Sequence, residues 1–107
     1  MKNLKSLTLL NAVAAAVAGA GIELHQGEDT FSFFPNTSGT VQLTLVIESL
    51  APDGKWYPIS AAVPYTTAGV QAPITIATIA ASQIRARVSA WTSGTITVTG
   101  YAGLQGL

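Results

Sequence analysis

Apolar and polar residues alternate one by one over long stretches of this sequence from Thr40 onward. In segment 40–49 one face carries apolar residues, namely Val41, Leu43, Leu45 and Ile47. The opposite face carries Gln42, Thr44 and Glu48, with Val46 as the exception. Segments 83–91 (QIRARVSAW) and 94–102 (GTITVTGYA) show the same period. A period of two is typical of half-buried β-strands, and the many β-branched residues agree. No segment predicts a helix longer than about two turns.

Turn-forming residues separate these segments. In 51–55 (APDGK), Pro52 and Asp53 suit a type I turn and Gly54 is free to take a positive φ, which predicts a hairpin into 55–60. Segment 91–95 (WTSGT) predicts a second hairpin turn, between the last two strands, with Gly94 left-handed. PNTSGT (35–40) and YTTAGV (65–70) predict further turns.

Three prolines, Pro58, Pro64 and Pro73, fall in or near predicted strands, so those strands are expected at sheet edges or to begin at the proline. Short strands between glycine and proline turns indicate an all-β chain. With 107 residues there is room for one core. We therefore predict one small antiparallel β-sandwich or jelly-roll-like domain over residues 1–107.

The first 21 residues, MKNLKSLTLLNAVAAAVAGAG, allow two interpretations. They resemble a secretory signal in their basic start and small residues. However, Thr8 and Asn11 interrupt the apolar segment, and alanine is a weak driver of membrane insertion, so we favour an N-terminal strand or arm. Segments 21–26 and 31–35 predict further strands. The apolar run 12–20 is shorter than the roughly 20 residues that span a bilayer, so no membrane association is expected.

Charged residues make up only 9% of the chain, against about 25% in typical soluble domains. The formal net charge is +0, which argues against nucleic acid as a partner. The absence of cysteine excludes disulfides and thiolate chemistry. A chain with so little charge is expected to expose a surface rich in Thr, Ser and Gln, and to have much of it covered by neighbouring subunits.

Catalytic chemistry finds little support in the sequence. His25 is the single histidine, and Glu23, Glu28 and Asp29 are its nearest acidic neighbours. Because stable metal sites use three or four ligands, we interpret this segment as a polar strand end and loop. No nucleophile elbow and no phosphate-binding loop is present. We therefore predict no enzymatic activity, no metal and no cofactor.

Two arginines form the best candidate binding feature. Arg85 and Arg87 are two residues apart on one predicted strand and share its polar face. If a hairpin closes at 92–94, the threonines Thr95, Thr97 and Thr99 lie on that same face. We favour docking of these residues on carboxylates of a partner over simple solvation, because charge is so scarce in this chain.

The aromatic residues divide into core and surface candidates. Phe31 and Phe33 alternate with Ser32 and are expected in the core, leaving Phe34 at a strand end. Trp56 is expected to pack across the sandwich. Trp91 and Tyr101 are assigned to the core or an interface, although exposed rings of this kind also stack on sugars.

Three segments together, 8–24, 48–59 and 83–103, resemble small β-sandwich structural proteins of tailed-bacteriophage virions. The resemblance implies a capsid decoration (cement) protein that binds the major capsid or another virion protein. A tail, collar or fibre component is the alternative within that class. The resemblance also implies assembly in the host cytoplasm and location in the virion. We expect self-association, with a trimer as the working assumption. A secreted carbohydrate-binding or adhesin module is the alternative from a different class.

Overall fold

Two strands of 21 residues each form the centre of the fold. The computed structural model describes residues 4–24, 30–77 and 81–103. Strands β3 (Thr30–Leu50) and β8 (Gln83–Gly103) pair antiparallel from Thr30↔Gly103 to Ser49↔Ile84. β1 (Leu4–Val13) and β2 (Ile22–Glu23) pair with β8 on one side. On the other side β3 pairs with four short strands, namely β4 (Trp56–Pro58), β5 (Val63–Tyr65), β6 (Gly69–Val70) and β7 (Ile74–Ile76). The predicted all-β architecture is confirmed.

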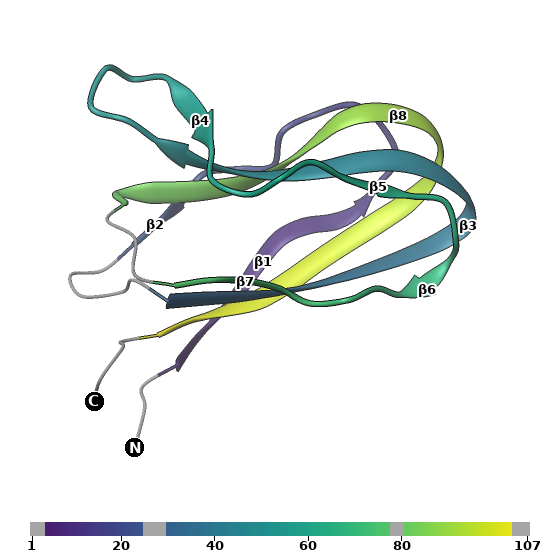
Figure 1. The fold of residues 1–107 in the computed structure, drawn as a ribbon, viewed down its shortest axis with the longest axis horizontal. Helices are drawn as coiled ribbons and strands as arrows, with labels where there is room; N and C mark the ends of the chain where they lie inside the picture. The colour runs from purple at the N-terminus through teal and green to yellow at the C-terminus, as the bar shows by residue number, and fades with distance from the viewer. Residues whose placement is uncertain (1–3, 25–29, 78–80, 104–107) are drawn as a thin grey trace.

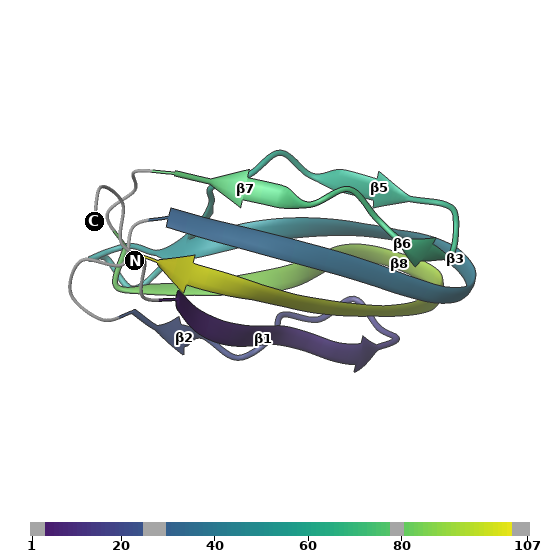
Figure 2. The same ribbon diagram turned by 90° about the horizontal axis from the view of Figure 1, so that it is seen from below.

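Both long strands bend near their middles, so that the sheet folds back on itself (Figures 1 and 2). The register shifts between Ser38 and Gln42, where Gly39 has a φ of 84° and Gly94 a φ of 92°. A Cβ placed on Gly39 would lie 3.8 Å from Gly94 Cα, so the two glycines face each other at the bend. The bend divides the sheet into two layers that pack face to face, as in a small β-sandwich.

We name the two layers the first and second half-sheets. The first half-sheet contains β1, residues 95–103 of β8, residues 30–38 of β3, and β6 and β7. The second contains β2, residues 83–93 of β8, residues 41–50 of β3, and β4 and β5. Leu4 and Gly103 pair with each other at the end of the molecule opposite the bend (Figure 1).

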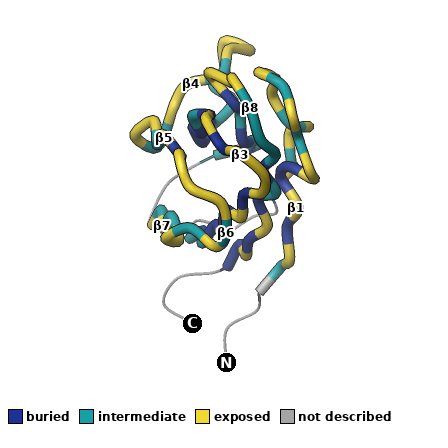
Figure 3. The backbone as a smooth tube through the Cα atoms, turned by 90° about the vertical axis from the view of Figure 1, so that its right-hand side faces the viewer, coloured by how far each residue is buried: buried dark blue, intermediate teal, exposed yellow. Residues whose placement is uncertain are grey.

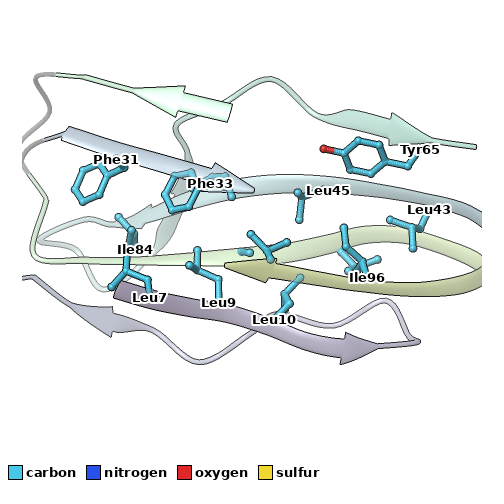
Figure 4. Close-up of a cluster of buried hydrophobic side chains, with 14 of the residues drawn as sticks. Leu7, Leu9, Leu10, Phe31, Phe33, Leu43, Leu45, Tyr65, Ile84 and Ile96 are labelled. Carbon is cyan, nitrogen blue, oxygen red and sulfur yellow. The ribbon is translucent and has the colours of Figure 1, made fainter. Parts of the chain in front are cut away.

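The core lies between the two half-sheets (Figure 4). The first half-sheet contributes Phe31, Phe33, Ile96 and Val98, and the second contributes Leu45, Ile47, Ile84 and Val88, all at most 1% exposed. β1 adds Leu7, Leu9 and Leu10. Buried and exposed residues alternate along β1 in Figure 3. The inward-facing residues predicted from the alternation are confirmed except for Ala90, which is exposed near the bend. Each fully buried Leu, Ile or Phe side chain contributes about 1.5–3 kcal/mol.

The hairpin predicted at 91–95 is wrong. Segments 35–40 and 91–95 lie inside β3 and β8 and bend those strands from one half-sheet into the other, without forming a hairpin. The two strands expected to form the final hairpin are therefore two halves of β8, and each half pairs with β3 instead of with the other. Gly94 takes a positive φ, as predicted, and so does Gly39, and both lie in the bend.

The hairpin predicted after segment 40–49 is confirmed. In the β3–β4 turn Gly54 has a φ of 82°, Gly54 N donates to Ala51 O at 3.0 Å, and Ala51 N donates to Lys55 O at 2.9 Å. Segment 65–70 leads from β5 in the second half-sheet to β6 in the first, with Gly69 at a φ of 113°. Both strands pair antiparallel with β3, so this segment follows the bend of β3 and forms no hairpin. The prolines also lie as expected, because Pro58 and Pro64 are in short outer strands and Pro73 directly precedes β7.

The N-terminal residues follow the strand interpretation. Residues 4–13 form β1, and within the described part of segment 21–26, residues 21–24, Ile22 and Glu23 form β2. Between them the chain crosses from the first to the second half-sheet: Val88 N donates to Val17 O at 2.9 Å and Gly19 N to Ala86 O at 2.8 Å. The described residues include no helix with the length and apolarity that a membrane crossing requires.

Candidate functional site

An acidic residue lies buried on the outer face of the second half-sheet. The alternation of β3 places Glu48 on that face, yet only 3% of it is exposed. Arg85 lies directly across from it on β8, and Arg87 lies two residues further along. Arg85 Nε donates to Glu48 Oε1 at 2.8 Å, and Arg87 Nε donates to Oε2 at 2.9 Å. One carboxylate therefore binds both arginines within the chain.

Trp56 stacks on one member of this group, Arg85. The guanidinium carbon of Arg85 lies 4.3 Å from the centroid of a Trp56 ring, a distance at which cation–π attraction is effective. The side chains of Arg85 and Arg87 are 22% and 40% exposed. Trp56 therefore packs on the outer face, and the prediction that it packs across the sandwich is wrong. We name Glu48, Trp56, Arg85 and Arg87 the Glu48 cluster. It joins β3, β4 and β8 and carries one net positive charge.

The threonines predicted to lie beside the arginines are on the other half-sheet. Because β8 bends at Gly94, Thr95, Thr97 and Thr99 belong to the first half-sheet and Arg85 and Arg87 to the second. Their core-facing neighbours Ile96 and Val98 place the threonines on the outer face of that layer. The expectation that all five residues share one face is therefore wrong. Their role in binding a partner stays a prediction.

The three threonines also differ in how their hydroxyls are used. Thr95 Oγ1 forms a hydrogen bond with Ser38 Oγ on the paired strand. Thr97 Oγ1 accepts a bond of 3.0 Å from Ala12 N, at a residue with a φ of 51° next to a register shift in β1. Thr99 is exposed and lies between Thr8 and Phe34. Thr95 and Thr97 thus hold strands together, whereas Thr99 faces outward.

Thr99 belongs to a face of aromatic and hydroxyl side chains. Strands β1, β8 and β3 lie side by side in the first half-sheet (Figure 2) and place these residues in two cross-strand rows. Phe34 and Tyr101 are diagonal neighbours with ring centroids 6.0 Å apart and ring planes at 78°. They are 39% and 44% exposed. We name this the aromatic–hydroxyl face, and its residues are Ser6, Thr8, Ser32, Phe34, Thr99 and Tyr101. Phe34 therefore lies within a strand, and the prediction that it lies at a strand end is wrong.

The other exposed aromatic residues have local partners. Trp91 is 39% exposed, and its Nε1 donates to Gly94 O at 2.9 Å beside the bend. Tyr57 is 48% exposed, and its hydroxyl donates to Asp53 Oδ2 at 2.7 Å. That bond, together with one from Lys55 N, lowers the pKa of Asp53, and it raises the pKa of Tyr57. These two rings are held by the turns that they flank.

Tyr65 has a buried hydroxyl without a hydrogen-bond partner. It projects from β5 into the core (Figure 4) and is 6% exposed. Burial raises the pKa of this phenol, because the ionised form is poorly solvated there.

The metal or catalytic alternative cannot be placed. His25, Glu28 and Asp29 lie outside the described residues, and Glu23 is exposed in β2. Within the described part of the chain, no three or more His, Cys, Asp or Glu side chains gather as metal ligands would.

Sequence reasoning missed the importance of Glu48 and Phe34. Glu48 directly follows three apolar residues, 45–47, and an acidic residue in such a context needs a nearby cation. Phe34 breaks the alternation of FSFF and shares the parity of Ser32, which is the signal for an outward-facing ring.

Comparison with known proteins concerns the fold. No family model matches this sequence, and no curated protein matches it. The structure is similar to the crystal structure of the SPBc2 prophage-derived protein YomS, with a TM-score of 0.77 and 12% identity over 96% of this chain and 95% of that one. A structure of Bacillus endospore appendages, described as a novel family of disulfide-linked pili, aligns with a TM-score of 0.46 and 19% identity over 98% and 87% of the two chains. The first likeness shows that this chain shares its fold with a prophage-derived protein.

Proposed function

We propose that this protein is a structural component of a tailed-phage virion and that it decorates the capsid. The observation that carries the proposal is the common fold with a prophage-derived protein along nearly the whole of both chains. The segments that resemble phage virion proteins support it independently. A tail, collar or fibre component would use the same sandwich and is the alternative.

A surface with little charge supports a role in assembly. Glu48 pairs with two of the five Lys and Arg residues of the chain, so few unpaired charges remain to keep the outer faces hydrated. Many small contacts between such surfaces and capsid subunits would add their binding energies through multivalency. Self-association, as a trimer in our working assumption, would raise the valency further.

The Glu48 cluster is the proposed contact with another virion protein. Its net positive charge and the partly exposed guanidinium group of Arg87 suit a carboxylate on the partner. The aromatic–hydroxyl face, which includes Thr99, lies on the opposite half-sheet and stays uncovered by this contact.

The direct test is the position of the protein in the virion. Purified virions of the phage that encodes this chain are reconstructed by electron cryomicroscopy, and the sandwich is fitted into the density. Density on the outer surface of the head supports decoration, and density in the tail supports the alternative. Virions that lack the protein by mass spectrometry would overturn both.

A second test addresses the contact. Replacing both arginines with alanine would leave the buried Glu48 carboxylate unpaired, so a better variant combines Glu48→Gln, Arg85→Gln and Arg87→Gln. This triple variant keeps hydrogen-bonding groups and removes the charges. Attachment to undecorated capsids should weaken by roughly 1–3 kcal/mol for each lost charge-assisted bond. Lys55→Gln, in the exposed β3–β4 turn, is the matched control, and equal occupancy by wild type and triple variant would contradict the contact.

A further inference from the structure

The aromatic–hydroxyl face combines two exposed rings with hydroxyl groups and contains no charged residue. In one row Ser6, Tyr101 and Ser32 lie opposite one another on β1, β8 and β3, and Thr75 on β7 extends that row. In the second row Thr8, Thr99 and Phe34 do the same. Residues of both rows line a shallow hollow of about 240 Å³. The face therefore offers apolar ring surface with polar neighbours on every side.

The hydroxyl groups of this face differ from several others in the described part of the chain, whose hydrogen bonds link segments of the fold. Thr97 accepts from Ala12 N, Thr37 donates to Thr67 O, and Ser60 accepts from Ile47 N. By contrast, among the described residues no hydrogen bond joins the hydroxyls of the aromatic–hydroxyl face to another protein group. Each free hydroxyl can donate one bond and accept two. A ligand that covers this face must offer hydroxyl groups in return, or these groups would lose their hydrogen bonds to water.

We propose that the aromatic–hydroxyl face binds neutral sugar units of a glycan. The C–H face of a pyranose ring is apolar and packs on an aromatic ring, while its hydroxyls point outward as donors and acceptors. Phe34 and Tyr101 supply the rings, and Thr8, Thr99 and their serine neighbours supply the bonds. The face has no basic residue to select an anionic sugar. The proposal does not depend on the virion role, because purified protein alone should bind.

A second copy of this chain is the competing occupant. A copy packed on this face would bring neutral rings together but would bury five or more unpaired hydroxyls, which is costly unless each finds a partner. A glycan supplies such partners along its length. The observations therefore favour the sugar, and the oligomeric state becomes an outcome of the test.

The experiment titrates the purified protein with chitohexaose, cellohexaose and mannohexaose and records saturation-transfer NMR and calorimetry. We expect at least one of these sugars to bind with contacts to aromatic protons. Tyr101→Ala should weaken that binding about tenfold or more. Thr99→Val, which keeps the β-branched shape and removes the hydroxyl, should weaken it measurably. Tyr57→Ala and Thr92→Val remove an exposed ring and a hydroxyl elsewhere and should leave the affinity unchanged.

Three results would overturn the proposal. The first is that none of the three sugars binds the folded wild-type protein. The second is that the control variants lose as much affinity as Tyr101→Ala. The third is that light scattering shows a wild-type oligomer which Tyr101→Ala or Thr99→Val dissociates, with no sugar bound by either form. Circular dichroism of each variant shows that the fold is retained, and virion incorporation of Tyr101→Ala tests the decoration role separately.

Discussion

Glu48 accepts one hydrogen bond from each of two arginines at a position where the sheet would otherwise face solvent. Its place on the polar face of the strand could be predicted from the alternation, and this is confirmed. Its burial could not be predicted, because Arg85 and Arg87 become its neighbours only through the β3–β8 register and lie 37 and 39 residues away in sequence. Local patterns contain no information about such a register.

Loss of the Glu48 charge should destabilise the fold. Glu48→Ala leaves two arginines without their carboxylate, so the free energy of unfolding should fall by roughly 3 kcal/mol. Glu48→Gln keeps the shape and should cost about 2 kcal/mol. Urea denaturation measures both, and Glu23→Gln in the exposed strand β2 is the control. A loss below about 0.5 kcal/mol for Glu48→Ala would mean that the cluster does not stabilise the sheet.

Removal of the unpaired Tyr65 hydroxyl should have the opposite effect and stabilise the fold. Tyr65→Phe removes a buried polar group that has no partner and keeps the ring in the core. The variant should be at least as stable as wild type and gain up to about 1 kcal/mol, because no desolvated hydroxyl remains. Thermal unfolding at neutral pH measures the difference, and a clear loss of stability would indicate that the hydroxyl is bonded in solution.

The same residue predicts a response to alkaline pH. Burial raises the pKa of Tyr65 above the ordinary tyrosine value of 10.0, so the folded state holds this proton more tightly than the unfolded state. The contribution of this group to the free energy of unfolding is fully present below about pH 10 and is lost as the pH rises through the folded-state pKa. Tyr65→Phe should therefore lose less stability between neutral and alkaline pH than wild type does. Tyr57, whose pKa is also raised, makes the free energy of unfolding fall with alkaline pH in both proteins. Parallel curves for the two proteins would contradict the prediction.

At the scale of elements, the strands could be predicted better than their connections. Alternation identified the inward residues of β3 and β8, and proline identified the short outer strands. The segments around Gly39 and Gly94 contain the same residue types as the true turn at Gly54, and all three glycines take positive φ. Such a segment closes a hairpin if the residues on its two sides pair with each other, and it bends a strand if both sides pair with a third segment. That pairing is non-local. For this reason the predicted final hairpin was wrong, and with it the shared face of Arg85 and Thr95.

The two kinds of glycine should differ in their tolerance of a side chain. A Cβ on Gly94 would lie 2.9 Å from Val41 Cα and 3.0 Å from Thr40 O, whereas a Cβ on Gly54 would meet nothing within 4 Å. Gly54→Ala should therefore cost only the strain of a positive φ, about 1–2 kcal/mol. Gly94→Ala bears the same strain and must also displace the backbone of the partner strand, so its loss should be larger by at least about 1 kcal/mol. Chemical denaturation of the two variants tests this, and equal losses would show that the bend yields easily.

At the scale of the whole molecule, the two half-sheets are parts of the same two strands. If one layer formed its β3–β8 ladder while the other stayed unfolded, the apolar face of the folded layer would be exposed to water. Leu45 and Val98 lie on opposite layers and are both 0% exposed. The molecule should consequently unfold as one cooperative unit.

Native-state hydrogen exchange can test this cooperativity. The amides of Leu45 and Val98 should exchange with the same free energy of opening, equal to that of global unfolding. Far-UV circular dichroism during urea denaturation gives the global value independently. A difference above about 1 kcal/mol between the two amides would indicate that one layer opens alone.

The pairing of Leu4 with Gly103 gives the molecule two unlike poles. One pole holds both of these residues, at the facing ends of β1 and β8, and the other holds the bend at Gly39 and Gly94. Paired residues on antiparallel strands are about 5 Å apart, so a polypeptide fused directly before Leu4 or directly after Gly103 would begin at nearly the same point. A fused cargo domain would thus leave the bend pole and both outer faces uncovered. The same geometry permits a circular permutant in which a short linker joins the old ends and new ends open in the exposed loop 66–68, with every strand pairing kept.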